Sequence, residues 1–223
     1  MSQREGTGAS DMHHTAPQGA ATTPPSGPGR RARPEERPAV LAILRSAFQD
    51  DPLYRWLYPD TAVRADRLRP LFELMLDAAF RHDAVWVLDD LSAAAVHAHH
   101  PGEVISTDVV DRYVERLSTT LGPSRTLAVT EAMASCADFS PSAPHEVLHN
   151  IAVPPHARGR GAGSALLRHL LDRCDQRASS VYLESSNLRN LSLYRRHGFR
   201  PLGTVLLPGG ESPMTPMLRA PSP

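Results

Sequence analysis

The sequence contains no lysine, because all 24 of its basic residues are arginines. This absence excludes a lysine Schiff base, the lysine of a phosphate-binding P-loop and any other chemistry that needs a side-chain amine. The 24 basic residues are balanced by 24 acidic ones, so the formal net charge is zero. That balance argues against nucleic acids as partners.

Cysteines and long apolar runs are also scarce. The two cysteines, Cys136 and Cys174, form no spacing motif, and this pattern suits a reducing compartment. No apolar run approaches the roughly 18 residues that a membrane span needs, and the first residues lack the apolar core of a signal peptide. We therefore expect a cytoplasmic protein without membrane partners, either a monomer or a homodimer.

The first part of the chain differs in composition from the rest. Of residues 1–33, 21 are Gly, Pro, Ser, Thr or Ala. Such a segment buries too little apolar surface to offset the entropy lost on ordering. We predict a disordered tail over residues 1–33 and one folded domain over residues 34–223.

Hydrophobic periodicity predicts the elements of this domain. Helical spacing is found over 34–50, 62–80, 107–121, 124–136 and 188–197. One further helix is predicted from the apolar face formed by Leu166, Leu167, Leu170, Leu171 and Cys174. Strands are expected over 84–88 and 93–98 as a hairpin, over 146–153 and 181–183, and over 199–207 and 214–218 as a closing hairpin. The aromatic segment 51–59 is predicted to be a loop. Helices and strands in this order indicate an α/β or α+β layered fold around one mixed sheet.

The most informative segment is a glycine-rich turn, residues 158–164, between a predicted strand and a predicted helix. Its glycines allow a ligand to approach the backbone closely, and the following helix offers unpaired N–H groups. Arg158 and Arg160 add positive charge. The turn therefore favours a phosphate group, and the alternative is a flexible, solvated basic turn.

Two common phosphate-binding motifs do not fit this turn. A P-loop requires a lysine, and a dinucleotide fingerprint would require glycine where Ser164 stands. The spacing from Arg158 to Gly161 and Gly163, after a strand ending in Val153, resembles the coenzyme A pyrophosphate loop of the GCN5-related N-acetyltransferase (GNAT) family. A second GNAT motif, N-x6-Y-x3-G-F, is matched by Asn187, Tyr194, Gly198 and Phe199.

The resemblance is strong over residues 145–207, and it implies the GNAT fold, a mixed, mostly antiparallel sheet flanked by helices. It also implies that an amine directly attacks the thioester of acetyl-coenzyme A (acetyl-CoA). The residues it assigns to acetyl-CoA binding are Ile151, Ala152, Val153, Arg158, Gly159, Arg160, Gly161, Ala162, Gly163, Ser164 and Asn187. The Val153 N–H is the implied donor to the thioester oxygen, whereas Asn187 could instead cap a helix.

Tyr194 is the leading catalytic candidate, because a phenol beside the sulfur can protonate the leaving thiolate. The alternative is a core tyrosine packed on Phe199. The general base is not fixed: His149 has a suitable ordinary pKa, and Glu146, Glu184 or an ordered water are alternatives. A cluster of His97, His99 and His100 lacks further residues at ligand spacing, so no metal is expected.

A looser resemblance concerns puromycin N-acetyltransferase and its actinobacterial relatives. It rests on residues 50–52 (Asp-Asp-Pro), 85–87 (Val-Trp-Val), 183–184 (Leu-Glu) and 189–190 (Arg-Asn). We predict an N-acetyltransferase that acts on a small-molecule amine, such as an antibiotic or a metabolite. The alternatives are a protein or peptide amine as acceptor, and a non-catalytic acyl-CoA-binding module, which an intact Tyr194 argues against.

Overall fold

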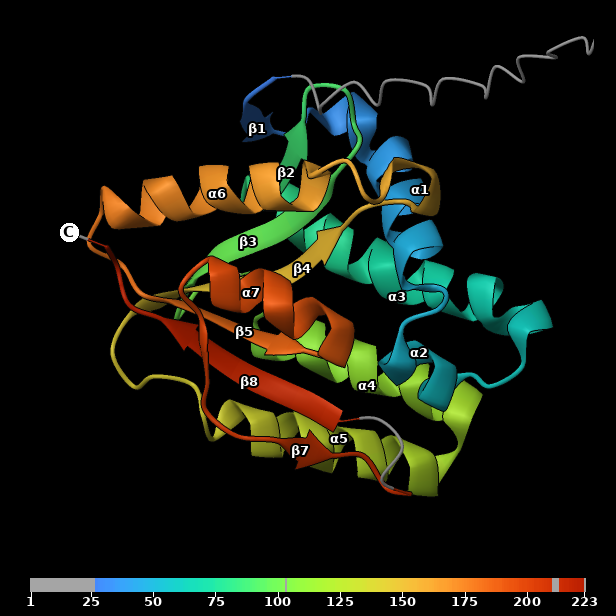
Figure 1. Cartoon of the computed structure of the whole chain (residues 1–223). Helices are drawn as coiled ribbons and strands as arrows, with labels where there is room; N and C mark the ends of the chain where they lie inside the picture. Colours follow the sequence, from blue (N-terminus) through green and yellow to red (C-terminus); the bar gives the residue numbers. More distant parts are fainter. Residues whose placement is uncertain (1–26, 103, 210–212, 223) are drawn as a thin grey trace, which may run out of the picture.

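A computed structural model describes residues 27–102, 104–209 and 213–222 (Figure 1). The helices are α1 (Arg37–Phe48), α2 (Pro52–Leu57), α3 (Thr61–Arg81), α4 (Thr107–Leu121), α5 (Pro123–Ala137), α6 (Ala162–Asp175) and α7 (Leu191–Arg196), with short 3-10 turns η1 (Pro34–Glu36), η2 (Pro155–Ala157) and η3 (Leu188–Asn190). The strands are β1 (Gly29–Arg31), β2 (Val85–Leu88), β3 (Ala94–His100), β4 (His145–Ala152), β5 (Val181–Ser185), β6 (Arg200–Pro201), β7 (Val205–Leu206) and β8 (Pro213–Arg219).

The strands form one sheet in the order β1-β2-β3-β4-β5-β8-β6, and β7 pairs with β8 outside this path. Strands β4 and β5 are parallel, whereas the other pairings in the described residues are antiparallel. The predicted mixed, mostly antiparallel sheet flanked by helices is therefore confirmed. The predicted β2–β3 hairpin is present, with Val85 opposite Val96, and so is the closing β7–β8 hairpin, with Val205 opposite Met214.

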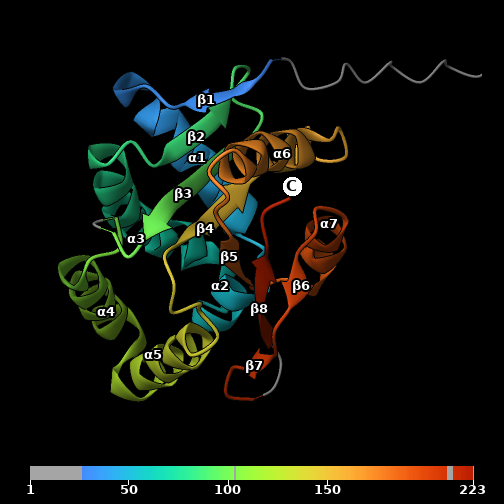
Figure 2. The same cartoon turned by 90° about the vertical axis from the view of Figure 1, so that its left-hand side faces the viewer.

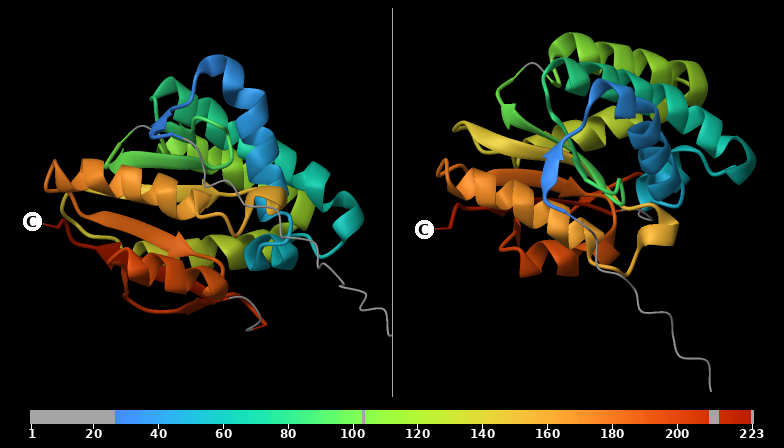
Figure 3. Two further views of the ribbon diagram at one scale, coloured as in Figure 1. Left: turned by 45° about the horizontal axis from the view of Figure 1, so that its top comes forward. Right: turned by 90° about the horizontal axis from the view of Figure 1, so that it is seen from above.

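Helices cover both faces of the sheet (Figures 2 and 3). Helices α1 to α5 lie on one face, where Leu44, Leu68 and Phe72 are fully buried. Helices α6 and α7 lie on the other face, where Leu166, Leu170 and Phe199 form a second core. Burial of each such side chain stabilises the fold by roughly 1.5–3 kcal/mol. None of the helices in the described ranges combines the length and apolarity needed to cross a membrane.

The segment predicted to be a loop, residues 51–59, contains helix α2. The Asp51 carboxylate accepts a hydrogen bond from the backbone N–H of Leu53 at 3.0 Å and so caps the helix. Pro52 occupies the first turn, where its fixed φ fits and its missing N–H costs nothing. The aromatic spacing does not reveal the helix because six residues are too few to show a period.

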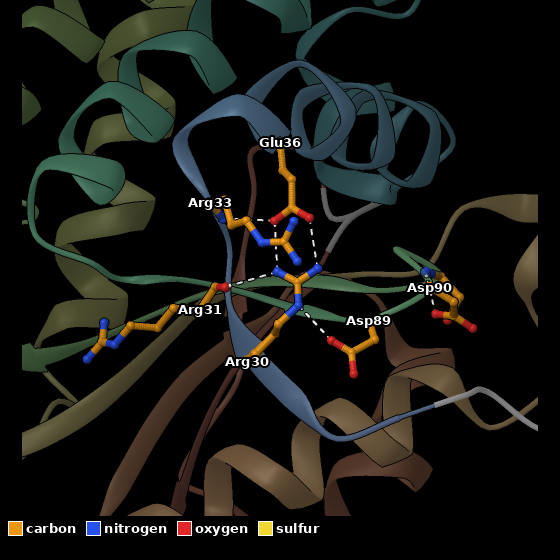
Figure 4. Close-up of polar contacts among 7 residues, drawn as sticks. Arg30, Arg31, Arg33, Glu36, Asp89 and Asp90 are labelled. Atoms are coloured by element: carbon orange, nitrogen blue, oxygen red, sulfur yellow. Dashed lines mark hydrogen bonds and ion pairs between the residues drawn. The ribbon is translucent and has the colours of Figure 1, made fainter.

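The predicted tail over residues 1–33 extends too far, because residues 29–31 form β1. Gly29 lies opposite Leu88 of β2. The Arg30 guanidinium donates two hydrogen bonds of 2.8 Å to Glu36 and one of 2.6 Å to Asp89 (Figure 4). This network ties β1 to the start of α1 and to the β2–β3 turn. Residues 1–26, the rest of the predicted tail, lie outside the described residues.

We expect the segment 27–33 to contribute to stability. A chain of residues 34–223 should unfold at least 2–4 °C below a chain of residues 27–223, because it loses β1 and the arginine network, together at least about 1 kcal/mol. Thermal unfolding followed by circular dichroism measures the difference. Equal melting temperatures would show that β1 adds nothing to the fold.

Candidate active site

The parallel strands β4 and β5 separate part-way along their length. They pair over residues 146–148 of β4 and 181–183 of β5. Beyond Leu148, β4 continues to Ala152 beside β3, while β5 continues to Ser185 beside β8. Within the described residues, no strand therefore pairs with the β4 edge that faces β5 after Leu148. The N–H and C=O groups of such an edge can bind an extended ligand as an additional strand.

A β-bulge lies where the strands separate. Asn150 is opposite Val96 and Leu148 is opposite His97, so His149 is an extra residue in β4. Bulges often re-aim side chains beside active sites. The His149 side chain is half-buried, and burial together with the nearby His100 lowers its pKa to about 4. At neutral pH the imidazole is uncharged, and its low basicity makes it a weak candidate for the general base.

The glycine-rich turn joins the end of β4 to α6, as predicted. Gly159 and Gly161 have φ of +77° and +84°, and a Cβ at either position would meet open space. Gly163 has no positive φ. A Cβ at this position would be crowded, because it would lie only 3.2 Å from Cγ2 of Val153. The first two glycines thus shape an accessible turn at the N-terminus of α6, and the third lets the helix pack closely on β4. This geometry suits a phosphate.

Three other residues assigned to this site have partners within the protein or lie at its surface. The Arg158 guanidinium donates to the carbonyl oxygens of Val153 at 3.3 Å and of Ala47, the latter in α1, at 3.0 Å. Ser164 is hydrogen-bonded to the His197 imidazole at 2.8 Å. Arg160 is exposed. Arg158 therefore holds the turn against β4 and α1, a structural role that the sequence does not reveal.

The second motif lies after β5: Asn187 precedes the turn η3, and Tyr194 belongs to α7. The Asn187 side chain accepts a hydrogen bond from the Arg189 N–H at 3.0 Å, which is the capping role. Tyr194 is 7% exposed and packs edge-on against Phe199, with ring centroids 5.8 Å apart. Burial, and then the negative charge of Asp51, raise the pKa of Tyr194. The phenol therefore keeps its proton at neutral pH and has it available to donate.

Two glutamates considered as general bases occupy different environments. Glu146 is buried, with His97, His99 and Arg177 within 3.5–3.9 Å, in the part of β4 that still pairs with β5. Glu184 lies beyond the separation point, where it accepts a hydrogen bond from the Tyr182 hydroxyl at 3.1 Å. Burial raises the pKa of Glu184. The structure thus favours Glu184 over Glu146 as a residue of the site.

Asp51 is a site residue that the sequence analysis did not single out as functional. It lies between α1 and α2, is 6% exposed, and accepts a hydrogen bond from the Ser186 hydroxyl at 2.9 Å. Burial raises its pKa, and its charge raises the pKa of Tyr54 as well as that of Tyr194. In the sequence it stands out only as part of the Asp-Asp-Pro segment at residues 50–52.

The histidine cluster is divided between the two faces of the sheet. His97 is buried 3.6 Å from the Cys174 sulfur, whereas His100 packs on His145, with ring centroids 4.9 Å apart. Within the described ranges, no group of three or more His, Cys, Asp or Glu residues could hold a metal ion.

Stability depends on pH through two histidines, the buried His97 and the half-buried His149. Burial lowers the pKa of His97 to about 3 and that of His149 to about 4. Above pH 6.5 both are neutral in the folded and unfolded chains and contribute nothing, but below it the unfolded chain binds protons that the folded chain does not. Each histidine should lower the free energy of unfolding by at most about 1.4 kcal/mol per pH unit between pH 6.5 and its folded pKa.

Substitution of one histidine tests this pH dependence. Denaturant unfolding at pH 7.5, 6 and 5 should show a smaller loss of stability for His149→Gln than for the wild type. Glu36 does not interfere in this pH range. The hydrogen bonds from Arg30 lower the pKa of Glu36 to about 2, so the stability that Glu36 contributes is lost only below about pH 4.5. Identical slopes for the two proteins would contradict a low pKa of His149.

Comparisons with known proteins agree with this geometry. Residues 126–199 match the model of the acetyltransferase (GNAT) family. A crystal structure of "histone acetyltransferase HPA2 and related acetyltransferase" from Corynebacterium glutamicum is 27% identical, with a TM-score of 0.65, and the match covers 89% of this chain and 98% of that one. Arylalkylamine N-acetyltransferase 2 from Aedes aegypti is 11% identical, with a TM-score of 0.61 and coverages of 87% and 98%.

Polyamine N-acetyltransferase from Drosophila melanogaster is also similar, at 16% identity, a TM-score of 0.57 and coverages of 86% and 98%. The protein therefore has the fold of the GNAT acetyltransferases. The sequence match to the family lies in the segment that carries the glycine-rich turn and Tyr194.

Proposed function

We propose that the protein is an N-acetyltransferase that transfers the acetyl group of acetyl-CoA to a primary amine of a small molecule. One observation carries the proposal: β4 separates from β5 beside an open glycine turn at the N-terminus of a helix. This combination accommodates a ligand with both amide groups and a pyrophosphate, as acetyl-CoA has. The buried, protonated phenol of Tyr194 adds a proton donor.

The residues would share the binding of acetyl-CoA as follows. Backbone N–H groups of residues 159–164 bind the pyrophosphate, and the β4 edge at Ile151–Val153 pairs with the pantetheine. The Val153 N–H donates to the thioester oxygen, and the Asn187 amide nitrogen is available for a pantetheine carbonyl. Such backbone donors are preorganised and stabilise the negative charge that develops on the oxygen.

The reaction proposed is direct transfer. The amine nitrogen attacks the thioester carbonyl carbon, the new C–N bond forms, and the C–S bond breaks. Tyr194 donates its proton to the departing sulfur, the nitrogen loses one proton to a base, and that proton restores the Tyr194 phenol. The net products are the N-acetyl amine and coenzyme A.

A small amine is the acceptor class favoured by the similar structures, which include arylalkylamine and polyamine N-acetyltransferases. The resemblance to puromycin N-acetyltransferase adds amine-bearing antibiotics to the same class. A protein amine is the second candidate, because the name of the Corynebacterium structure refers to a histone acetyltransferase.

The test is release of free thiol from acetyl-CoA in the presence of individual amines. The panel should contain an arylalkylamine, agmatine, a polyamine, puromycin and a histone-tail peptide. We expect release with at least one of the small amines. Release with the peptide alone would contradict the small-molecule acceptor, and binding of acetyl-CoA without release with any amine would indicate a non-catalytic module.

A further inference from the structure

A pocket of about 700 Å³ lies between α6, the end of α7, strand β6 and the end of β8 (Figure 2). Such a volume is typical of a site for a small molecule. The described residues that line it include four arginines and one carboxylate: Arg168 and Asp172 of α6, Arg196 of α7, Arg200 of β6 and Arg219 of β8. In a chain whose formal net charge is zero, this excess of positive charge is a property of the pocket.

One of the four arginine charges is already balanced. The Arg219 guanidinium donates two hydrogen bonds of 2.7 Å to the Asp175 carboxylate. Arg168, Arg196 and Arg200 are exposed, and none of them forms an ion pair in the described part of the chain. Three guanidinium groups of the pocket are therefore available to an anion.

The imidazole of His197, which also lines the pocket, shows that these charges converge. His197 is half-buried, and its Nε2 lies 2.8 Å from the Ser164 hydroxyl. Burial lowers the pKa of His197, and the positive charges of Arg168, Arg196 and Arg219 lower it further. The arginines that disfavour a proton on this imidazole would favour a negatively charged group in the same place.

The kind of anion follows from the arginines and from the apolar wall. A guanidinium matches a phosphate with two parallel hydrogen bonds, and a phosphate monoester carries about 1.5 to 2 negative charges at neutral pH. The leucines Leu171, Leu202 and Leu218 line the rest of the pocket, and Leu202 is 39% exposed. An inorganic ion would not contact them, whereas the organic group of a phosphate monoester would cover them.

The pocket begins about one helical turn from the glycine-rich turn. Arg168 follows Ser164 by four residues, which is about 6 Å along α6, and Ser164 is bonded to His197 at the edge of the pocket. A phosphate in the pocket and a pyrophosphate at the N-terminus of α6 can therefore belong to one ligand. Coenzyme A has both groups, because its adenosine carries a 3′-phosphate next to the pyrophosphate.

We propose that this pocket binds a phosphate monoester through Arg168, Arg196 and Arg200, with the organic group against the leucines. Two sources share this chemistry. One is the 3′-phosphate of coenzyme A, and this source rests on the proposed function. The other is a separate phosphorylated small molecule, which does not depend on that function.

The double variant Arg168→Gln/Arg196→Gln tests the proposal, because glutamine removes the charge from two exposed, unpaired side chains and should leave folding intact. Calorimetric titration compares acetyl-CoA, its 3′-dephospho form and adenosine 3′-monophosphate. If coenzyme A is the source, the wild type should bind acetyl-CoA at least about tenfold more tightly than the 3′-dephospho form, and the double variant at most about twofold more tightly. If the source is separate, the wild type should bind both coenzyme forms alike, and the double variant should bind adenosine 3′-monophosphate at least about tenfold more weakly.

Two controls accompany the double variant. Arg116→Gln/Arg195→Gln removes the same charge from two other exposed arginines, neither of which lines the pocket, and should keep every affinity within about twofold of the wild type. Gly161→Val alters the glycine-rich turn and should retain the binding of adenosine 3′-monophosphate. Loss of that binding in Gly161→Val, but not in the double variant, would place the phosphate in the turn and overturn the proposal.

The remaining outcomes separate this proposal from the acetyltransferase function. A wild type that binds both coenzyme forms alike, together with equal affinities of the wild type and the double variant for adenosine 3′-monophosphate, would overturn the pocket while the function stands. A wild type that binds no acetyl-CoA would contradict the proposed function, whereas the titration with adenosine 3′-monophosphate would still test the pocket.

Discussion

Replacement of Tyr194 by phenylalanine should lower kcat at least about tenfold and leave the affinity for acetyl-CoA nearly unchanged. Phenylalanine retains the edge-on packing against Phe199 and removes only the hydroxyl. General-acid assistance contributes about 10²–10⁴-fold, and water can replace part of it. Because the proposed binding of acetyl-CoA relies on backbone groups of residues 159–164, the change should not affect it. Steady-state kinetics and calorimetric titration with coenzyme A measure the two quantities.

A second acyl donor and a control variant test whether the loss comes from the missing proton. The loss of kcat should be smaller with an acyl donor whose leaving group has a lower pKa, because that group needs less protonation. Tyr58→Phe is a suitable control, since it also removes a buried hydroxyl, one that bonds to Thr120 at 3.0 Å, and should leave kcat unaffected. A folded Tyr194→Phe variant with full kcat would show that Tyr194 is only a packing residue.

Gly161→Val should weaken binding of acetyl-CoA by at least about a hundredfold. Gly161 has a φ of +84°, which costs an L-residue about 1–2 kcal/mol and more when the side chain is β-branched. The added isopropyl group would also project into the open space beside the N-terminus of α6, where the pyrophosphate is proposed to bind. Calorimetric titration with acetyl-CoA gives the change in Kd.

Gly122→Val is a control for backbone strain. Gly122 joins α4 to α5, and a Cβ there would also meet open space, but its φ of +76° and ψ of 167° lie in a region that essentially only glycine adopts, whereas Gly161 has a φ of 84° and a ψ of 2°. Gly122→Val should therefore lose at least as much thermal stability as Gly161→Val, but only Gly161→Val should lose affinity. A folded Gly161→Val variant with the wild-type Kd would refute the assignment of the turn. Gly163→Val should also lose affinity, by displacing Val153.

The elements that sequence predicts well are those whose signal is local. The helices α3, α4 and α5 form close to the predicted bounds, and α6 contains all five residues of its predicted apolar face. Strand β1 has no such signal, because Gly-Arg-Arg becomes a strand only by pairing with β2 and through the contacts of Arg30 with Glu36 and Asp89. The pairing with β2 and the contact with Asp89 join residues that are far apart in the chain.

The same distinction applies to the candidate site. The glycine turn and Tyr194 belong to short motifs, and the sequence therefore indicates them directly. Asp51 becomes notable only through contact with Ser186, 135 residues away. The sequence does not show the direction of a side chain either: Arg158 is part of a basic turn, yet its guanidinium donates to the carbonyl oxygens of Val153, just after β4, and of Ala47 in α1.

The bulge at His149 divides β4 into two halves that differ in phase. Leu148 and Ile151, three positions apart, pack on the same face of the sheet, although regular alternation would place them on opposite faces. Regular pairing of β4 with β3 through this stretch would place Ile151 on the face opposite Leu148, and the extra residue returns it to the same face. A one-residue insertion is thus enough to keep both ends of the strand packed on one core at the point where β5 diverges from it.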